Sequence, residues 1–423
     1  MSQTSPGDDP RIPDRLRHPV VWIAVVAVLV AILAWVVLTI TGDVKEDERQ
    51  DALAPFYTPP SPLPPGPPGT IIRTEPLGVT VKGGRAVRVL YRSQDALGRP
   101  TATSGMVFIP TGPVPAEGGR TVVAWAHGTV GLADQCAPSR IDAPTKNIPW
   151  VELMMARGWV VAATDYAGLG TPGTPGFLIS GDEGRDVINS VRAARNLPGA
   201  NASNRWVAWG HSQGGHAALA SADIAASYAP ELDLAAIAAA APATDLRGLL
   251  ALQWNQSAAW VIGAYVVGTW PTVYPGLDRN SLLTANGQNH WQEILGECVK
   301  GAALTAIVRQ DLLGQDFFVD DPWQSPPWRR RFIQNTPQPT PRGVPLMIAQ
   351  STTDDVVLPR TTASVIDRWC RAGVGIGTLW VNDVSHITTA EVVGPSVVQW
   401  IGQRLAGEPA PNDCGAPTPV PPL

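Results

Sequence analysis

The stretch VAWGHSQGGHAALA, residues 207–220, decides how the rest of the chain is interpreted. In it, an apolar run ends at Gly-His-Ser-Gln-Gly-Gly, and an alanine-rich run with helical character follows. A serine at a sharp strand-to-helix turn is the pattern of a nucleophile elbow, which exposes the serine hydroxyl at its apex. Side chains two positions before and after Ser212 would collide in such a turn, which explains Gly210 and Gly214. A glycine-rich loop or a phosphate-binding turn has the same short pattern, so the elbow needs support from partner residues elsewhere.

The overall composition is that of a folded protein with a sizeable core. The chain has 423 residues, 44% of them hydrophobic, and a formal net charge of −5. This length allows two average domains or one large α/β domain with an insertion. The charge balance does not favour a nucleic-acid partner, because there is no excess of basic residues. The sequence contains no Cys-x-x-Cys pair and no His/Cys cluster of the kind that would indicate a bound metal.

An uncharged segment near the amino terminus has the length of a membrane span. Val20 to Ile40 contains 21 residues without a charge. As a helix it would extend about 31 Å, which matches a hydrocarbon core of about 30 Å. The alternative is a cleavable signal peptide, but its apolar region is usually shorter, and the Ala52-Leu53-Ala54 sequence lies well beyond this one. We predict a transmembrane signal anchor at 20–41.

Flanking charges predict the orientation of this anchor. Arg11, Arg15 and Arg17 precede it, whereas the two basic residues that follow are diluted by acidic ones. The positive-inside rule then predicts a cytoplasmic tail (1–19), a linker (42–54) and an extracytoplasmic catalytic part. If the anchor is cleaved, that part is secreted.

The remainder of the chain alternates between strand-like and helix-like runs. Short apolar runs that end in polar loops occur at 121–128, 159–170, 205–210, 234–245, 344–355 and 377–386. Helical patterns lie between several of them, around 148–157, 184–196, 214–228 and 361–372. This alternation predicts a mostly parallel sheet covered on both faces, with functional residues at the carboxyl ends of the strands.

A serine nucleophile requires a base and an acid that orients the base. In α/β-hydrolases the order along the chain is Ser, then Asp or Glu, then His. Beyond the elbow stretch 207–220, only His290 and His386 follow Ser212. His290 has no strand before it, whereas His386 follows the last strand-like run, so His386 is the predicted base.

The acid is expected directly after the preceding strand, where Asp354 and Asp355 are found. Asp383 is a weaker candidate, because it lies only three residues before His386 on the same segment. Spacing alone does not separate Asp354 from Asp355.

An oxyanion hole requires two backbone N–H donors. The residue after the nucleophile, Gln213, is expected to supply one. The loop after an early strand, AHGTVG, is expected to supply the other through Gly128 or Thr129. We interpret His127 as a residue that orders this loop and not as the base.

Several separated motifs resemble the secretory lipase family of α/β-hydrolases, which includes fungal lipase A-like proteins and actinobacterial relatives. The matching pieces, over about residues 55–404, are PFYTPP, LYRSQDALGRPTATSGMVFIP, AWAHGTVG, TDYAGLGTPG, GHSQGGHAAL, TTDDVV and SHITTA. The family pattern Thr-x-Asp-x-x-Val selects Asp354 as the acid. The resemblance implies hydrolysis of carboxylic esters, typically acylglycerols, without a metal or an organic cofactor. It also implies that the proline-rich residues 55–69 begin the folded domain.

The domain organisation follows from the position of one long interval. About 100 residues separate the strands that end near Thr244 and begin near Val344, whereas a βαβ unit needs only about 30. We therefore predict a largely helical cap insertion at 245–340, between hydrolase core segments 55–244 and 341–406, with a tail at 407–423. The chain from Gly248 to Leu277 contains no charged residue or histidine.

The predicted cap contains six of the sixteen tryptophans, and most of them are expected to form its own core. A second membrane span is not expected there, because the apolar run 258–270 is too short. We predict that part of the cap lines an acyl-chain pocket, with the following candidates: Trp260, Val261, Tyr265 and Val266.

The four cysteines all follow the predicted anchor, and an even number in an exported region predicts two disulfides. Of the three possible connectivities we favour Cys136–Cys298 and Cys370–Cys414. The first would join the oxyanion-side loop to the cap, and the second would join a late helix to the tail.

Two other functions remain open from the sequence. An acyltransferase would use the same acyl-enzyme with an alcohol in place of water. A non-enzymatic, membrane-anchored binding protein could retain the hydrolase fold, although the complete set of catalytic residue types argues against it. A prolyl-type peptidase is disfavoured, because the chain lacks room for the large extra β domain.

Overall fold

The computed structural model describes residues 27, 45–116, 118–340 and 343–423. It divides into two units, Met1–Pro55 and Phe56–Leu423. The predicted cytoplasmic tail (1–19) and transmembrane anchor (20–41) lie outside the described residues, apart from Ala27. The predicted linker (42–54) is helical from residue 45. Among the described helices, none is long and apolar enough to cross a membrane.

One sheet of nine strands is the centre of the described second unit, in the order β1-β2-β3-β5-β4-β6-β7-β8-β9. β1 pairs with β2, β2 with β3 and β3 with β5 in antiparallel orientation, and the other five pairings are parallel. This confirms the predicted α/β class with a mostly parallel sheet. The bounds are β1 Ile71–Pro76, β2 Gly84–Gln94, β3 Pro100–Pro110, β4 Arg120–Ala126, β5 Val160–Thr164, β6 Ala202–His211, β7 Asp233–Ala240, β8 Leu346–Ser351 and β9 Ile376–Val381.

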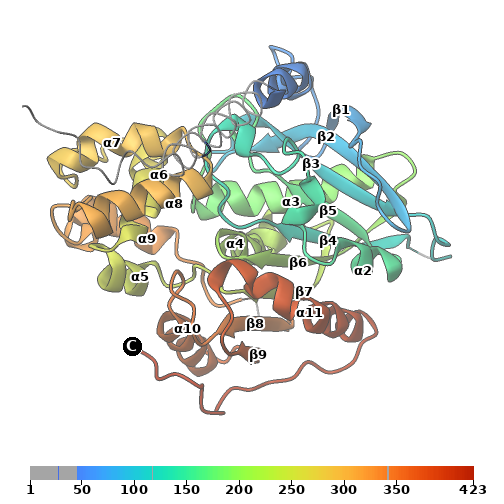
Figure 1. Cartoon of the computed structure of the whole chain (residues 1–423). Helices are drawn as coiled ribbons and strands as arrows, with labels where there is room; N and C mark the ends of the chain where they lie inside the picture. Colours follow the sequence, from blue (N-terminus) through green and yellow to red (C-terminus); the bar gives the residue numbers. More distant parts are fainter. Residues whose placement is uncertain (1–26, 28–44, 117, 341–342) are drawn as a thin grey trace, which may run out of the picture. The chain divides into compact units, whose positions relative to one another are not determined.

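Helices cover both faces of this sheet (Figure 1). One face packs against α3 (Ser180–Asn196), α4 (Gln213–Tyr228) and α10 (Pro359–Arg371), and the other packs against α2 (Val151–Ala156) and α11 (Thr389–Leu405). The central strands are therefore buried on both sides, which is why β4 and β5 consist almost entirely of apolar residues.

Five α-helices lie between β7 and β8, in the segment 245–340, which we call the helical insertion. They appear in yellow to orange beside the sheet in Figure 1. Their apolar residues form a separate hydrophobic cluster, and α6 is buried on most of its surface. The bounds are α5 Leu246–Gln253, α6 Ser257–Val273, α7 Ala285–Leu295, α8 Val299–Ile307 and α9 Pro326–Gln334. The exact limits proposed for the domains stay predictions.

Both disulfides have the predicted connectivity. Cys136–Cys298 joins the loop after β4 to the start of α8, and Cys370–Cys414 joins α10 to the C-terminal tail. The first link is supported by a backbone hydrogen bond of 2.8 Å from the Val299 N–H to the Val130 carbonyl. The tail also pairs with β9, because the Asp413 N–H donates to the Ile376 carbonyl at 2.8 Å.

The proline-rich start of the second unit is part of the fold, as the resemblance implied. Phe56 and Tyr57 are buried, and the Tyr57 hydroxyl forms a 2.7 Å hydrogen bond with Ser139 Oγ.

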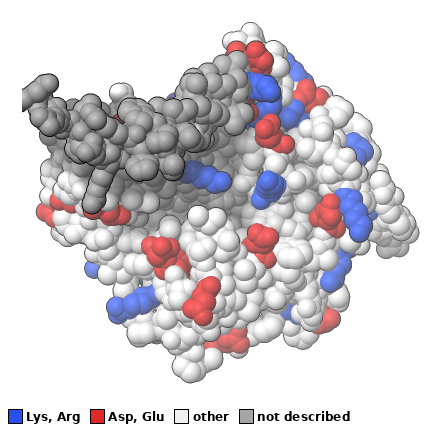
Figure 2. Space-filling view, in the orientation of Figure 1, with Lys and Arg blue, Asp and Glu red and all other residues white. Residues whose placement is uncertain are grey.

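The face of the molecule shown in Figure 2 has few charged side chains, and its basic and acidic residues are dispersed. This agrees with a charged fraction of only 16%.

The first turns of α3 contain buried carboxyl groups. Asp182 accepts a hydrogen bond from the Ala96 N–H, and Asp186 accepts from the hydroxyls of Ser93 and Thr103. Burial raises the pKa of Asp182 to about 7 and the pKa of Asp186 to about 6. Each group therefore binds its proton more tightly in the folded chain than in the unfolded chain.

Replacing Asp182 with Asn should stabilise the protein more at pH 8 than at pH 5. Because the folded-state pKa of Asp182 is raised from 3.8 to about 7, its contribution to the free energy of unfolding falls as pH rises through that window. Asn carries no charge, and its Oδ1 can still accept from Ala96. Thermal denaturation of both proteins between pH 5 and 8 measures this. A difference in Tm that does not change with pH would contradict the interpretation.

Candidate active site

Ser212 lies at a strained turn between β6 and α4. Its backbone has φ 57° and ψ −119°, a conformation that non-glycine residues rarely adopt. A Cβ on Gly210 would lie 2.0 Å from the Gly214 carbonyl oxygen, and a Cβ on Gly214 would lie 1.9 Å from the Ala126 carbonyl oxygen. The two glycines are therefore sterically required, for the reason inferred from the sequence.

The structure brings Ser212, His386 and Asp354 into one hydrogen-bonded chain. His386 Nε2 lies 2.8 Å from Ser212 Oγ, and His386 Nδ1 lies 2.8 Å from Asp354 Oδ2. The Nδ1–H donates to the carboxylate, so Nε2 is left to accept the serine proton. All three side chains are buried. The three segments that carry them follow the carboxyl ends of β6, β8 and β9.

The loop after β8 fixes the carboxylate of Asp354. Its Oδ1 accepts hydrogen bonds of 2.9 Å from the N–H groups of Val356 and Val357, and its Oδ2 accepts one of 3.0 Å from Gln350 Nε2. These donors fix the position of the carboxylate and leave Oδ2 directed at His386.

The alternative candidates from the sequence lie elsewhere. Asp355 and Asp383 are exposed. His290, on α7, pairs with Glu293 and Arg309 within the helical insertion. None of the three joins the chain of hydrogen bonds at Ser212.

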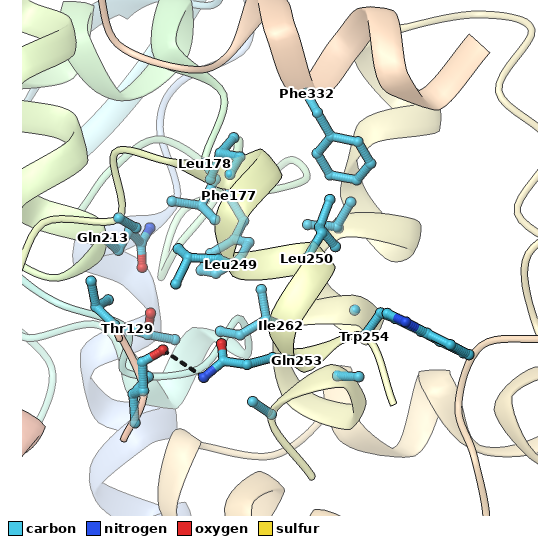
Figure 3. A pocket seen from close by; sticks show the side chains of 18 of the residues that line it. Thr129, Phe177, Leu178, Gln213, Leu249, Leu250, Gln253, Trp254, Ile262 and Phe332 are labelled. Carbon is cyan, nitrogen blue, oxygen red and sulfur yellow. Dashed lines mark hydrogen bonds between the residues drawn. The ribbon is translucent and has the colours of Figure 1, made fainter. Parts of the chain in front are cut away.

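The predicted oxyanion residues adjoin Ser212. Gln213 is the first residue of α4, where a backbone N–H has no partner within the helix. Thr129 and Gln213 line the same cavity as Ser212 (Figure 3). A Cβ on Gly128 would lie 3.1 Å from His211 Nδ1 and 3.3 Å from the His211 carbonyl oxygen, so this glycine permits close approach of the two loops.

His127 orders the loop that contains Gly128. It is buried, its Nδ1 lies 2.7 Å from the Gly128 carbonyl oxygen, and its own carbonyl accepts a 3.2 Å hydrogen bond from the Tyr166 hydroxyl. Burial lowers the pKa of His127, so its imidazole stays neutral. These contacts agree with the structural role inferred from the sequence.

His211 is a site residue that sequence reasoning left without a role. Its ring packs on the ring of His386 with a centroid distance of 4.9 Å, and its Nε2–H donates to the His386 carbonyl at 2.9 Å. Burial, with the neighbouring His386, lowers the pKa of His211 to about 3, so it remains neutral. The only sequence signal was its position directly before the serine.

An apolar cavity adjoins Ser212 and is lined by loops at the carboxyl ends of the strands and by the helical insertion. Figure 3 shows side chains of this lining. On α5, the Gln253 side chain donates to the Val356 carbonyl at 3.1 Å, which connects this helix to the loop that carries Asp354. Apart from Ser212, Thr129 and Gln213, the lining includes Phe177, Leu178, Leu246, Leu249, Leu250, Trp254, Ala258, Ile262, Val266, Trp270, Phe318 and Phe332.

Three of the four predicted pocket residues do not line this cavity, which corrects that prediction. Val266 does, but Trp260, Val261 and Tyr265 lie in the core of the helical insertion. The reason is helical periodicity, because the residues of α6 that line the cavity lie on one face and recur about once per turn. They are Ala258, Ala259, Ile262, Gly263, Val266 and Trp270.

The two aromatic residues of that prediction, Trp260 and Tyr265, pack on other aromatic rings. Trp260 packs on Phe317 at a centroid distance of 5.0 Å, and its Nε1–H donates to the Gln315 carbonyl at 2.8 Å. Tyr265 lies edge-on to Phe177 at 5.2 Å. Trp260 therefore stabilises the insertion, whereas Tyr265 packs on a residue of the cavity wall without lining the cavity itself. No group of three or more His, Cys, Asp or Glu side chains suited to a metal ion occurs among the described residues.

Comparison with known proteins identifies the family. Residues 146–413 match the family described as secretory lipase, which is more than half of the chain. The chain belongs to the secretory lipase family. Membership assigns it to the carboxylic ester hydrolases and indicates an exported protein.

Relatives in the secretory lipase family cover most of the chain. A Mycobacterium tuberculosis protein described as a probable inactive lipase is 26% identical over an alignment 395 residues long, which covers 84% of this chain and 82% of that protein. A secreted triacylglycerol lipase of Malassezia globosa is 25% identical over 387 residues, with coverages of 85% and 82%.

Solved structures show that the fold is shared. Candida antarctica lipase A in its closed state has a TM-score of 0.69 at 20% identity, with 86% of this chain and 89% of that chain covered. The rice cell wall degrading esterase LipA from Xanthomonas oryzae has a TM-score of 0.68 at 19% identity, with coverages of 81% and 100%.

Proposed function

We propose that this secretory lipase homologue hydrolyses carboxylic esters, with acylglycerols as the substrate class, through an acyl-enzyme on Ser212. The observation that carries the proposal is the continuous chain of hydrogen bonds from Ser212 through His386 to Asp354 beside an apolar cavity. One relative is described as a probable inactive lipase, so family membership alone does not establish activity. The complete arrangement of catalytic side chains supports activity in this chain.

The reaction follows from the proton positions. His386 Nε2 accepts the Ser212 proton as Oγ attacks the ester carbonyl carbon, and Asp354 stabilises the resulting imidazolium. The backbone N–H groups of Gln213 and of Gly128 or Thr129 stabilise the oxyanion. His386 then returns the proton to the leaving alcohol as the C–O bond breaks. Water, activated by the same histidine, releases the carboxylic acid and restores the serine.

Ser212→Ala should lower kcat on a soluble ester by roughly 10⁴- to 10⁶-fold, because it removes the nucleophile. A fluorophosphonate probe should label the wild-type protein at Ser212 and leave the variant unlabelled. Ser227→Ala, at the exposed end of the same helix, is the matched control and should retain labelling and activity. Normal hydrolysis by the Ser212 variant would refute the mechanism.

The cavity supports a preference for esters with longer acyl chains. Its walls are almost entirely apolar, and each buried methylene contributes about 0.8 kcal/mol. Four additional carbons would then favour a longer chain by about 3 kcal/mol if all were accommodated. Ala258 on α6 is a suitable position to test this, because it faces the cavity and is small.

Ala258→Leu should lower kcat/KM for octanoyl and decanoyl esters by roughly tenfold relative to acetyl esters, because the larger side chain occupies space for distal carbons. Specificity constants on monomeric esters of two to ten acyl carbons measure the effect. The control Ala251→Leu makes the same change at an exposed position on α5 that does not line the cavity. A wild-type preference for acetate would overturn the acyl-pocket assignment.

We also propose that residues 20–41 anchor the enzyme in the cytoplasmic membrane with its catalytic unit outside. The proposal rests on the uncharged 21-residue segment, its flanking charges and the two disulfides.

Protease added to intact spheroplasts should digest the catalytic unit, and the unit should sediment with membranes before digestion. Protection from protease would overturn the orientation. Recovery from the medium of a chain that lacks residues 20–41 would show that the segment is a cleaved signal peptide. A cytosolic protein of known location serves as the control for lysis.

A further inference from the structure

A buried pair of ionisable side chains lies directly behind the nucleophile turn. Glu183 on α3 and His216 on α4 have side-chain exposures of 1% and 0%, and Glu183 Oε2 lies 2.7 Å from His216 Nδ1. Neither residue belongs to the proposed Ser212–His386–Asp354 chain.

Glu183 holds the residue that follows the nucleophile. Its Oε1 accepts a 2.7 Å hydrogen bond from the Gln213 side chain and a 2.8 Å hydrogen bond from the backbone N–H of Leu178. Gln213 and Leu178 both line the cavity. One carboxylate thus fixes a cavity wall and the first residue of α4, whose backbone N–H is the proposed oxyanion donor.

Hydrogen-bond acceptors lie beside both ring nitrogens of His216. Nδ1 faces the Glu183 carboxylate, and Nε2 lies 2.7 Å from the Asn335 carbonyl oxygen. The Ser180 hydroxyl, 3.3 Å from Nε2, donates its own proton to the same carbonyl. Both hydrogen bonds of the ring form when one proton lies between Nδ1 and Glu183 and a second proton is on Nε2. With these two protons the pair as a whole has no net charge.

This neutralisation matters for the proposed chemistry. A buried, unpaired carboxylate in contact with Gln213 would oppose the negative charge that develops on the substrate oxygen. Because the pair with His216 has no net charge, Glu183 can hold Gln213 without presenting a charge to the site.

Asn335 connects the pair to the helical insertion. It caps the C-terminal end of α9 and is almost completely buried. Its side-chain oxygen accepts hydrogen bonds of 3.1 Å from the Ser180 N–H and 3.0 Å from the Tyr274 hydroxyl, at the end of α6. A path of three hydrogen bonds thus leads from the insertion to Gln213.

We propose that Glu183 and His216 are positioning residues for Gln213, which they hold as a charge-neutral pair tied through Asn335 to the helical insertion. The proposal rests on the proposed function, because it concerns the donor that stabilises the oxyanion. It assigns no contact with substrate to either residue.

Two substitutions of Glu183 separate positioning from charge. In Glu183→Gln, the side-chain oxygen can still accept from Gln213 and Leu178. Its amide can donate to Nδ1 of a neutral His216, whose Nε2–H still donates to Asn335. All hydrogen bonds survive without any charge, so kcat should stay within about threefold of the wild-type value. Glu183→Ala removes the support of Gln213 and should lower kcat roughly 10- to 100-fold, with KM within about twofold.

Steady-state kinetics on a butyrate ester, with circular dichroism to verify folding, tests these expectations. Asp182→Asn alters the adjacent carboxyl on α3, which contacts Ala96 and not Gln213, and should leave kcat unchanged. If Glu183→Ala does not fold, Gln213→Ala removes the same hydrogen bond from its other end and should show the same selective loss of kcat.

The outcomes are distinguishable from failure of the proposed function. The positioning role would be overturned if Glu183→Ala left kcat unchanged or changed only KM. If Gln213→Ala has to replace that variant, the same two results for Gln213→Ala would overturn it. A loss in Glu183→Gln equal to that in Glu183→Ala would overturn the charge-neutral pairing. In each case Ser212 would still be labelled by fluorophosphonate, whereas absence of Ser212-dependent hydrolysis in the wild type would refute the proposed function itself.

Discussion

Backbone-to-backbone packing around Ser212 is the constraint on which the site depends. The carbonyl of Ala126, at the end of β4, approaches Gly214 so closely that a Cβ there would lie 1.9 Å away. The adjacent strand β6 ends beside the end of β4, and Ser212 follows it with a positive φ. Because β4 and β6 pair in parallel, the loop with Gly128 and Thr129 and the start of α4 reach the serine together. The strain at Ser212 is thus maintained by the central strands of the sheet.

Much of this arrangement could be predicted because it follows from strand order. Functional side chains in a parallel sheet gather at the carboxyl ends of strands, and the chain places Ser212, Asp354 and His386 after three such ends. Spacing did not separate Asp354 from Asp355, and the family pattern was needed. The structure supplies the physical difference, since Asp354 is buried and accepts two backbone N–H groups, whereas Asp355 is exposed.

Other parts of the site had no sequence signal that could place them. Helix α6 is apolar on nearly all sides, so its composition does not show which side faces the cavity, and Trp260 and Tyr265 were chosen in error. The contacts of His211 with His386 and of Glu183 with His216 join residues 33 to 175 positions apart. Such contacts depend on side-chain packing in three dimensions and not on any local pattern.

The link between Cys136 and Cys298 has a consequence for the compartment in which the enzyme matures. This bond, with the hydrogen bond from Val299 to Val130, attaches the loop beside the nucleophile to the helical insertion. Two segments that each contribute residues to the cavity lining are therefore joined by a covalent bond that forms only where thiols are oxidised. Chains made in a reducing cytosol would have the same sequence and the same sheet, but the relative position of these two segments would rest on non-covalent contacts alone. Export is in this sense a step in the assembly of the active site.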